Sequence, residues 1–208
     1  ETIKANVITT LENYNTSTLQ KFDSVFRYSK VVKLIDDTDA SILSNISTIQ
    51  MRKQFTTTLN ISLKYNVYFR NALYNPHTGH NATSGGILKS TGFKVSGNTN
   101  EHFLDDDGNG NVRAYYLSGA TRVYSNSTQG TIDYSTGAIT INSLQVTEIS
   151  NIRGSASSVI ELTVQPSSND IVPVRDQIIE LDIANSTITV EKDTFVAGSS
   201  DAGVGYST

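Results

Sequence analysis

The stretch that decides the fold class is STLQKFDSVFRYSKVVKLIDDTDASILSNISTIQMR, residues 17–52. Ser17, followed three residues later by Gln20, has the spacing of a capping box, which predicts that a helix begins here. Apolar side chains continue until a run of aspartates ends the pattern. From Asn45 onward apolar and polar residues alternate one by one, as they do in a strand. A helix that leads into a strand indicates an α+β fold, and no residue in this stretch is placed for catalysis.

A shorter helix is predicted before this stretch. Ile3, Val7 and Leu11 lie four residues apart and form one apolar stripe. The inner face of the second helix is expected to carry Leu19, Phe22, Val25 and Phe26. This helical pair and the first strand are expected to make up residues 1–55.

The remainder, residues 56–208, is predicted to be a mainly antiparallel β domain. Between Leu59 and Phe69 every second residue is apolar, which predicts a strand with one buried face and one solvent-exposed face. Residues 71–100 are rich in Gly, Asn, Ser and Thr, and we expect a long polar loop that carries one short strand. The small, polar residues 197–208 are expected to form a flexible tail.

Short strand patterns separated by turn residues fill most of this domain. They are VRAYYL (112–117), TRVY (121–124), GTIDY (130–134), GAITI (137–141), SVIELTVQ (158–165), RDQIIELDIA (175–184) and STITVEK (186–192). Residues 134–137 and 184–187 are predicted hairpin turns, because Gly and Asn tolerate a positive φ. Regular short strands with frequent turns indicate a sandwich-like β domain.

The composition excludes several classes of function. The chain has 208 residues and no cysteine, which removes thiol chemistry and cysteine-bound zinc. Its formal net charge is -4, and its Lys and Arg residues are scattered, so nucleic acid is not an expected partner. No apolar run reaches the roughly 18 residues of a membrane span, and no membrane contact is expected. We expect no cofactor.

One motif is similar to a calcium-binding loop. Asp105, Asp107 and Asn109 have the spacing of oxygen ligands in an EF-hand, and Gly110 has the place of its sharp turn. The twelfth position is Tyr116 instead of a bidentate glutamate, and the following residues have a strand pattern. We expect a polar turn between two strands, with weak calcium binding as the alternative.

Three histidines could in principle hold zinc. His77 and His80 lie in a segment with Pro and Gly, and His102 lies further along the chain. Nothing in the sequence fixes their relative geometry. Exposed loop histidines are therefore expected, without a metal site.

Two groups of carboxylates could support glycosidase-type chemistry. Asp36, Asp37 and Asp39 form one group, but they more simply end a helix. Glu180 and Asp182 form the other, on the wet face of a predicted strand. No nucleophile elbow and no glycine-rich phosphate loop is present. We expect no catalytic residues, and an enzyme is not predicted.

Three segments resemble one family of phage proteins. They are KFDSVFRYSKVVKLIDDTDASILSNISTIQMRK (21–53), FLDDDGNGNVRAYY (103–116) and GTIDYSTGAITI (130–141). Each is similar to the C-terminal part of the baseplate wedge protein of T-even-like contractile-tailed phages, in the baseplate J-like group. The first residue is Glu1 and the single methionine is Met51, so we expect this chain to be part of a longer protein.

The resemblance implies an architectural role. Wedge proteins of this family associate with one another and with neighbouring wedge proteins in a ring around the tail tube. It implies a virion location, after assembly in the host cytoplasm. Phe22, Phe26 and Tyr28 are the expected contributors to self-association; the alternative is that they are buried within one protomer.

A second hypothesis for the function is a carbohydrate- or cell-surface-binding β module. Its support is the chain's 10 tyrosines, the expected β domain and the long polar loops, since sugar sites stack on exposed aromatic rings. The absence of tryptophan weakens it.

Overall fold

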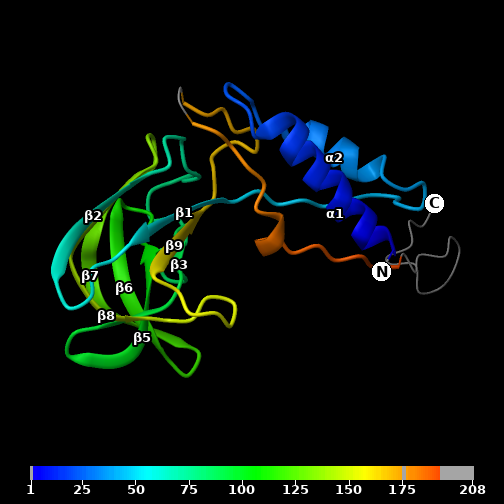
Figure 1. Ribbon diagram of the computed structural model, residues 1–208. Coiled ribbons are helices and arrows are strands. Elements are labelled where there is room, and N and C mark those ends of the chain that lie inside the picture. The colour runs from blue at the N-terminus through cyan, green and yellow to red at the C-terminus, as the bar shows by residue number, and fades with distance from the viewer. Residues whose placement is uncertain (1, 175–176, 193–208) are drawn as a thin grey trace, which may run out of the picture. The chain divides into compact units, whose positions relative to one another are not determined.

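The computed structural model describes residues 2–174 and 177–192. The chain forms two compact units, each drawn from separate parts of the sequence. The described part of the first, the helical unit, comprises residues 2–20, 29–45 and 180–192. The second, the β unit, takes the rest of the described chain (Figure 1).

The helical unit contains most of the two N-terminal helices. They are α1 (Thr2–Tyr14) and α2 (Tyr28–Asp36), and one turn of π-helix (Asn15–Leu19) extends α1. The predicted stripe of α1 is confirmed at Val7 and Leu11, which are buried. Asn15 holds the C-terminal segment of the unit, since its side-chain oxygen accepts a hydrogen bond from the Leu181 amide at 2.8 Å.

The second helix begins at Tyr28, so the start predicted at Ser17 is wrong. At Asp23 φ is 60°, a left-handed conformation that no helix can pass through. The Tyr28 amide donates to a carboxylate oxygen of Asp170 at 2.8 Å. A residue 142 positions away therefore satisfies this helix N-terminus, in place of the local capping box.

In its described residues, the β unit has nine strands in two sheets. The strands are β1 (Met51–Thr56), β2 (Ser62–Tyr68), β3 (Lys89–Ser90), β4 (Phe93–Val95), β5 (Asn98–Asp106), β6 (Asn111–Ser118), β7 (Thr121–Asp133), β8 (Ala138–Ile149) and β9 (Val159–Val164). All pairings are antiparallel, as the sequence predicted. The short strand expected within the long loop is split into β3 and β4, which belong to different sheets.

The larger sheet has the order β2-β8-β4-β5-β6-β7, and an additional β7–β8 pairing makes it barrel-like. The first residues of β8 pair with β7 and its last residues pair with β4, so five strands close a ring. Gly130 lies where β7 pairs with β8. A side chain there would not fit, because a Cβ would come within 1.9 Å of the Thr140 carbonyl oxygen. The strands curve around a common interior in Figure 1. The expected sandwich is not confirmed.

The smaller sheet has the order β1-β9-β3. β1, which the sequence grouped with the helices, pairs with β9 from Met51 opposite Val164 to Thr56 opposite Val159. A single apolar core lies beneath both sheets. It comprises Val67, Phe69, Leu73, Ile87, Leu88, Phe93, Leu104, Val112, Ala114, Ile132, Ile139, Ile141, Leu144, Val146, Ile160, Leu162 and Val164.

Three local predictions for strands are wrong. The strand expected from Asn45 begins only at Met51. Leu59 and Ile61 lie in a turn before β2 and remain exposed, because Asn60 has a φ of 62°. Residues 177–182 and 186–192 form no strand, and Ile183–Asn185 is a short 3-10 helix where a hairpin turn was expected. The expected tail, residues 197–208, lies outside the described residues.

Candidate functional site

The three aromatic residues expected at an interface lie in different environments. Phe22 is 73% exposed, whereas Phe26 is only 2% exposed and lies within its own protomer. Tyr28 is half-buried, and its hydroxyl donates to the Ser47 carbonyl at 3.0 Å. Of the three, Phe22 presents the most side-chain surface to a partner.

The segment that carries Phe22 is held at its C-terminal end. Phe26 and Ile171 form an isolated antiparallel bridge, with two backbone hydrogen bonds of 2.9 and 3.0 Å. Arg27 donates to Asp170 at 2.9 Å, and this hydrogen bond, followed by that of the Tyr28 amide, lowers the pKa of the Asp170 carboxyl. These contacts fix the backbone beyond Phe22 while its ring stays in solvent.

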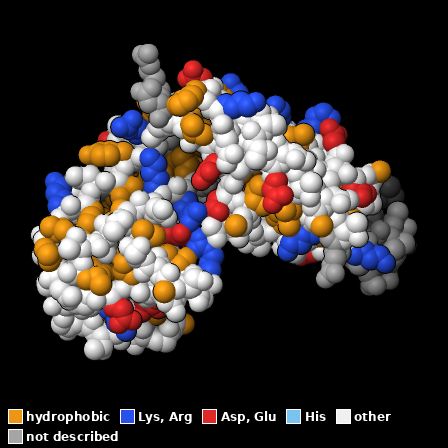
Figure 2. Space-filling view, viewed as in Figure 1, with side chains coloured by type: hydrophobic (Ala, Val, Ile, Leu, Met, Phe, Trp, Pro, Cys, Tyr) orange, Lys and Arg blue, Asp and Glu red, His pale blue; other side chains and the backbone are white. Residues whose placement is uncertain are grey.

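Further exposed apolar side chains follow in the same N-terminal region. Leu43 is 77% exposed and Ile46 is 99% exposed, in a segment without regular secondary structure. The sequence placed Ile46 in a strand, but no other strand pairs with it among the described residues. Figure 2 shows that other hydrophobic side chains are scattered over the visible face of the β unit.

The calcium-like motif is an internally satisfied turn between β5 and β6. Asp107 accepts hydrogen bonds from the Asn109 and Asn111 amides and from the Asn111 side chain, at 2.7–3.0 Å. These hydrogen bonds lower the pKa of Asp107 despite its partial burial. The expectation of a polar turn is confirmed.

Asp105, from the same motif, forms a buried ionic cluster that the sequence analysis missed. Its side chain is 2% exposed; it accepts from Arg113 at 2.9 Å, from Arg122 at 2.6 Å and from the Tyr124 hydroxyl at 2.9 Å. Arg113 also donates to the Ala82 carbonyl at 2.7 Å and so ties the long loop to the sheet. The sequence did contain a signal for this ion pair, because the turn between β5 and β6 places Asp105 opposite Arg113.

The histidines do not converge on one point. His77 and His80 have ring centroids 5.0 Å apart, while His102 is fully buried and contacts the Asn100 carbonyl at 2.8 Å. Burial of His102 corrects the expectation that all three are exposed, and it follows from the inward position of His102 on β5. Within the described residues no group of three His, Cys, Asp or Glu residues could hold a metal ion.

The carboxylates suggested for acid and base chemistry have local partners. Asp36 accepts from Asn45 at 2.6 Å, Asp37 pairs with Lys33 at 2.7 Å, and Asp39 accepts from the Ser41 hydroxyl at 2.6 Å. That last hydrogen bond is the main cause of a lowered pKa at Asp39. In the C-terminal group, Asp182 accepts from Asn185 at 2.7 Å. None of these contacts brings two carboxylates together over a pocket.

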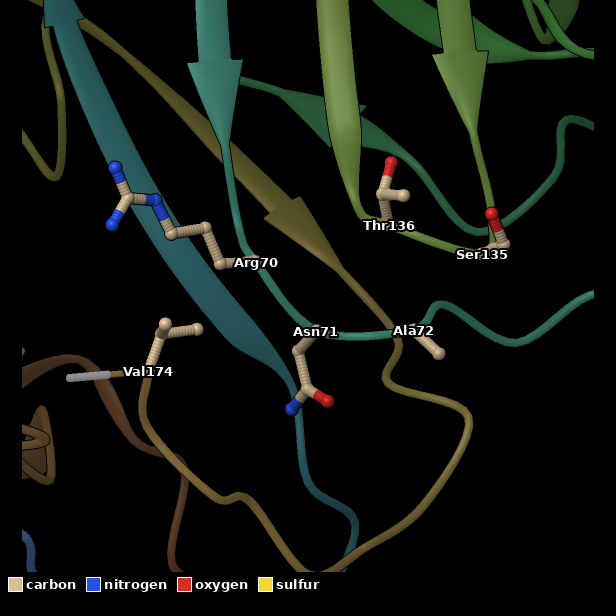
Figure 3. Close-up of a pocket in the computed structure, with 6 residues that line it drawn as sticks. All are labelled: Arg70, Asn71, Ala72, Ser135, Thr136 and Val174. Carbon is tan, nitrogen blue, oxygen red and sulfur yellow. The ribbon is translucent and has the colours of Figure 1, made fainter.

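An open pocket of about 510 Å³ lies on the β unit. Its lining residues are Arg70, Asn71, Ala72, Ser135, Thr136 and Val174 (Figure 3). The two hydroxyl side chains are occupied, since Ser135 and Thr136 each donate to Asp133 at 2.7 Å. In Figure 3, Arg70 points away from them, on the side of β1.

The hairpin turn beside this pocket contains Asp133, whose lowered pKa can be tested by titration. Hydrogen bonds from Ser135 and Thr136 lower the pKa of Asp133 from 3.8 to about 2. The carboxylate therefore adds stability that is present above pH 4 and is lost as the pH falls through 2. A Ser135→Ala/Thr136→Val variant is expected to raise this pKa toward 3.8. Carbon-detected NMR titration checks it, and an unchanged pKa in the variant would contradict the assigned cause.

No helix within the described residues 2–174 and 177–192 is long and apolar enough to cross a membrane.

The N-terminal part of the chain matches a known protein family. A search of curated proteins found none that matches this chain. Residues 1–54 match the family model described as baseplate structural protein gp6, C-terminal domain III. The matched region includes α1, α2 and the exposed residues Phe22, Leu43 and Ile46. This match, over the first 54 of 208 residues, supports a phage baseplate structural role.

Proposed function

We propose that this chain is the C-terminal part of a baseplate wedge protein of a contractile-tailed phage, in the baseplate J-like group. It self-associates and binds neighbouring wedge proteins in a ring around the tail tube, after assembly in the host cytoplasm. The observation that carries the proposal is the coincidence of the family match, residues 1–54, with the exposed apolar residues Phe22, Leu43 and Ile46. Exposed apolar surface is what protein–protein contacts cover.

Self-association is assigned to Phe22 rather than to all three aromatic residues. Phe26 is buried, so an aspartate there would unfold its own protomer, whereas Phe22 can change without loss of internal packing. Aromatic side chains of this kind supply much of the binding energy at interfaces.

The test is sedimentation of the parent and of a Phe22→Asp variant over a range of concentrations. We expect the parent to form oligomers and the variant to remain monomeric at the same concentrations. Thr99→Asp is the matched control, because it adds the same charge at an exposed position on β5. A folded Phe22→Asp variant that keeps the parent's mass would count against this interface.

Two tyrosines of the β unit, Tyr115 and Tyr124, give the carbohydrate-binding alternative no support. Arg113 lies 4.2 Å from the ring centroid of Tyr124, and Arg122 lies 4.6 Å from that of Tyr115. A guanidinium group therefore occupies one face of each of these two rings, where a sugar would otherwise stack.

A further inference from the structure

Arg70 differs from the other described arginines in having no acidic partner. Arg27, Arg52, Arg113, Arg122 and Arg153 each pair with an aspartate or glutamate. No hydrogen bond or ion pair of Arg70 is found within residues 2–174 and 177–192, and its side chain is exposed at the edge of the open pocket. A guanidinium with five donors and no partner is suited to an external acceptor.

The backbone at Arg70 is held in a conformation that favours glycine. Its φ is 53°, in the left-handed region. The flanking chain fixes it there, because the Phe69 amide donates to the Gly137 carbonyl at 2.8 Å and the Leu73 amide donates to the Tyr134 carbonyl at 2.7 Å. Strained positions of this kind occur often at binding sites.

A second cation lies close to Arg70. Lys53 on β1 donates to the Tyr68 carbonyl at 2.7 Å, and its pKa is lowered first by burial and then by the positive charge of Arg70. Asp133 keeps its negative charge while it accepts hydrogen bonds from Ser135 and Thr136, and within the described residues it forms no ion pair with Lys53 or Arg70. Two cations therefore influence each other at this place, and neither forms an ion pair within the described residues.

We propose that Arg70 and Lys53 form a docking point for an acidic side chain on an extended segment of a neighbouring protein. A carboxylate matches the planar fork of arginine, and Val174, 43% exposed in the same pocket, suits an apolar residue next to that acid. Two cations on a chain of net charge -4 suit a single carboxylate better than a polyanion. This inference rests on the proposed role in baseplate assembly, and it names the chemistry of one partner contact.

The test uses the full chain labelled with ¹⁵N and titrated with a capped hexapeptide that carries one glutamate next to a valine, with inorganic phosphate as a second arm. We expect saturable shifts of the amides at residues 69–72 and 135–137. Arg70→Gly is expected to weaken peptide binding about tenfold or more, as loss of a charged hydrogen-bonding partner does. The melting temperature of this variant should not fall, because glycine adopts this φ without strain.

Lys64→Ala is the matched control, since it removes an exposed charge from β2 without a described partner and should leave binding unchanged. The inference is overturned if these amides do not shift, if Arg70→Gly binds as the parent does, or if phosphate binds more tightly than the peptide. Its failure is distinct from that of self-association, because sedimentation of the Phe22→Asp variant does not depend on the peptide.

Discussion

Asp105→Ala is expected to destabilise the β unit by about 3–5 kcal/mol, the usual loss when one partner of a buried ion pair is removed. The Asp105 carboxylate is 2% exposed and neutralises Arg113, whose side chain is 10% exposed. Without this carboxylate, the guanidinium of Arg113 would remain buried as an uncompensated charge between the sheet and the long loop. Arg122, at 28% exposure, can turn toward water and should contribute less to the loss. Urea denaturation followed by circular dichroism measures the change, since the chain has no tryptophan.

Two further variants test the cause of this loss. Glu101→Ala changes an exposed acid on the same strand and is expected to alter stability by less than about 0.5 kcal/mol. Asp105→Leu combined with Arg113→Met removes both charges and is expected to recover much of the stability, because a buried pair often stabilises no more than apolar side chains of similar size. If Asp105→Ala costs no more than Glu101→Ala, the cluster is not a structural ion pair.

Local signals in the sequence predicted the elements that local interactions determine. The stripe through Val7 and Leu11 predicted α1, and both residues are buried there. The turn predicted at residues 134–137 joins β7 to β8, and Gly137 has a φ of 70° as such a turn requires. In both cases the residues that determine the conformation are neighbours in the chain.

Elements that depend on distant residues were not predictable in the same way. The start of α2 is satisfied by Asp170, which no local pattern could indicate. The apolar alternation from Leu59 predicted one buried face throughout, but only Val67 and Phe69 at its end are fully buried, and Tyr65 is half-buried against the core. Burial depends on which strands lie opposite, and that is a property of the closed sheet.

The candidate site shows the same division. The pairing of Asp105 with Arg113 follows from the turn between them, so the sequence contained it. Arg122 reaches Asp105 from a third strand, β7. The register between β6 and β7 shifts along the pair, so the sequence alone does not show which residues lie opposite each other. The isolation of Arg70 could not be read from the sequence either, because absence of a partner is known only when all neighbours are placed.

Phe93→Ala is the second change expected to have a large effect, about 3–5 kcal/mol of lost stability. Phe93 is fully buried in β4, where it pairs with His102 on β5 and with Ile149 on β8. The strand has only three residues, so few backbone hydrogen bonds hold it between its neighbours. Loss of the ring removes its packing and leaves a cavity at the strand that joins β8 to β5.

Phe103→Ala is the matched control for this change. Phe103 belongs to the adjacent strand β5 but points to its other face, where it is only half-buried and lies 5.7 Å from the ring of Tyr115. We expect it to cost less than half as much, because part of its side chain is already in water. Amide hydrogen exchange adds a readout of ring closure: Phe93→Ala should accelerate exchange in β4 and in the last residues of β8 before it does so in the β1–β9 pair. Equal losses of stability in the two variants, with uniform exchange, would show that closure of the five-stranded ring does not depend on Phe93.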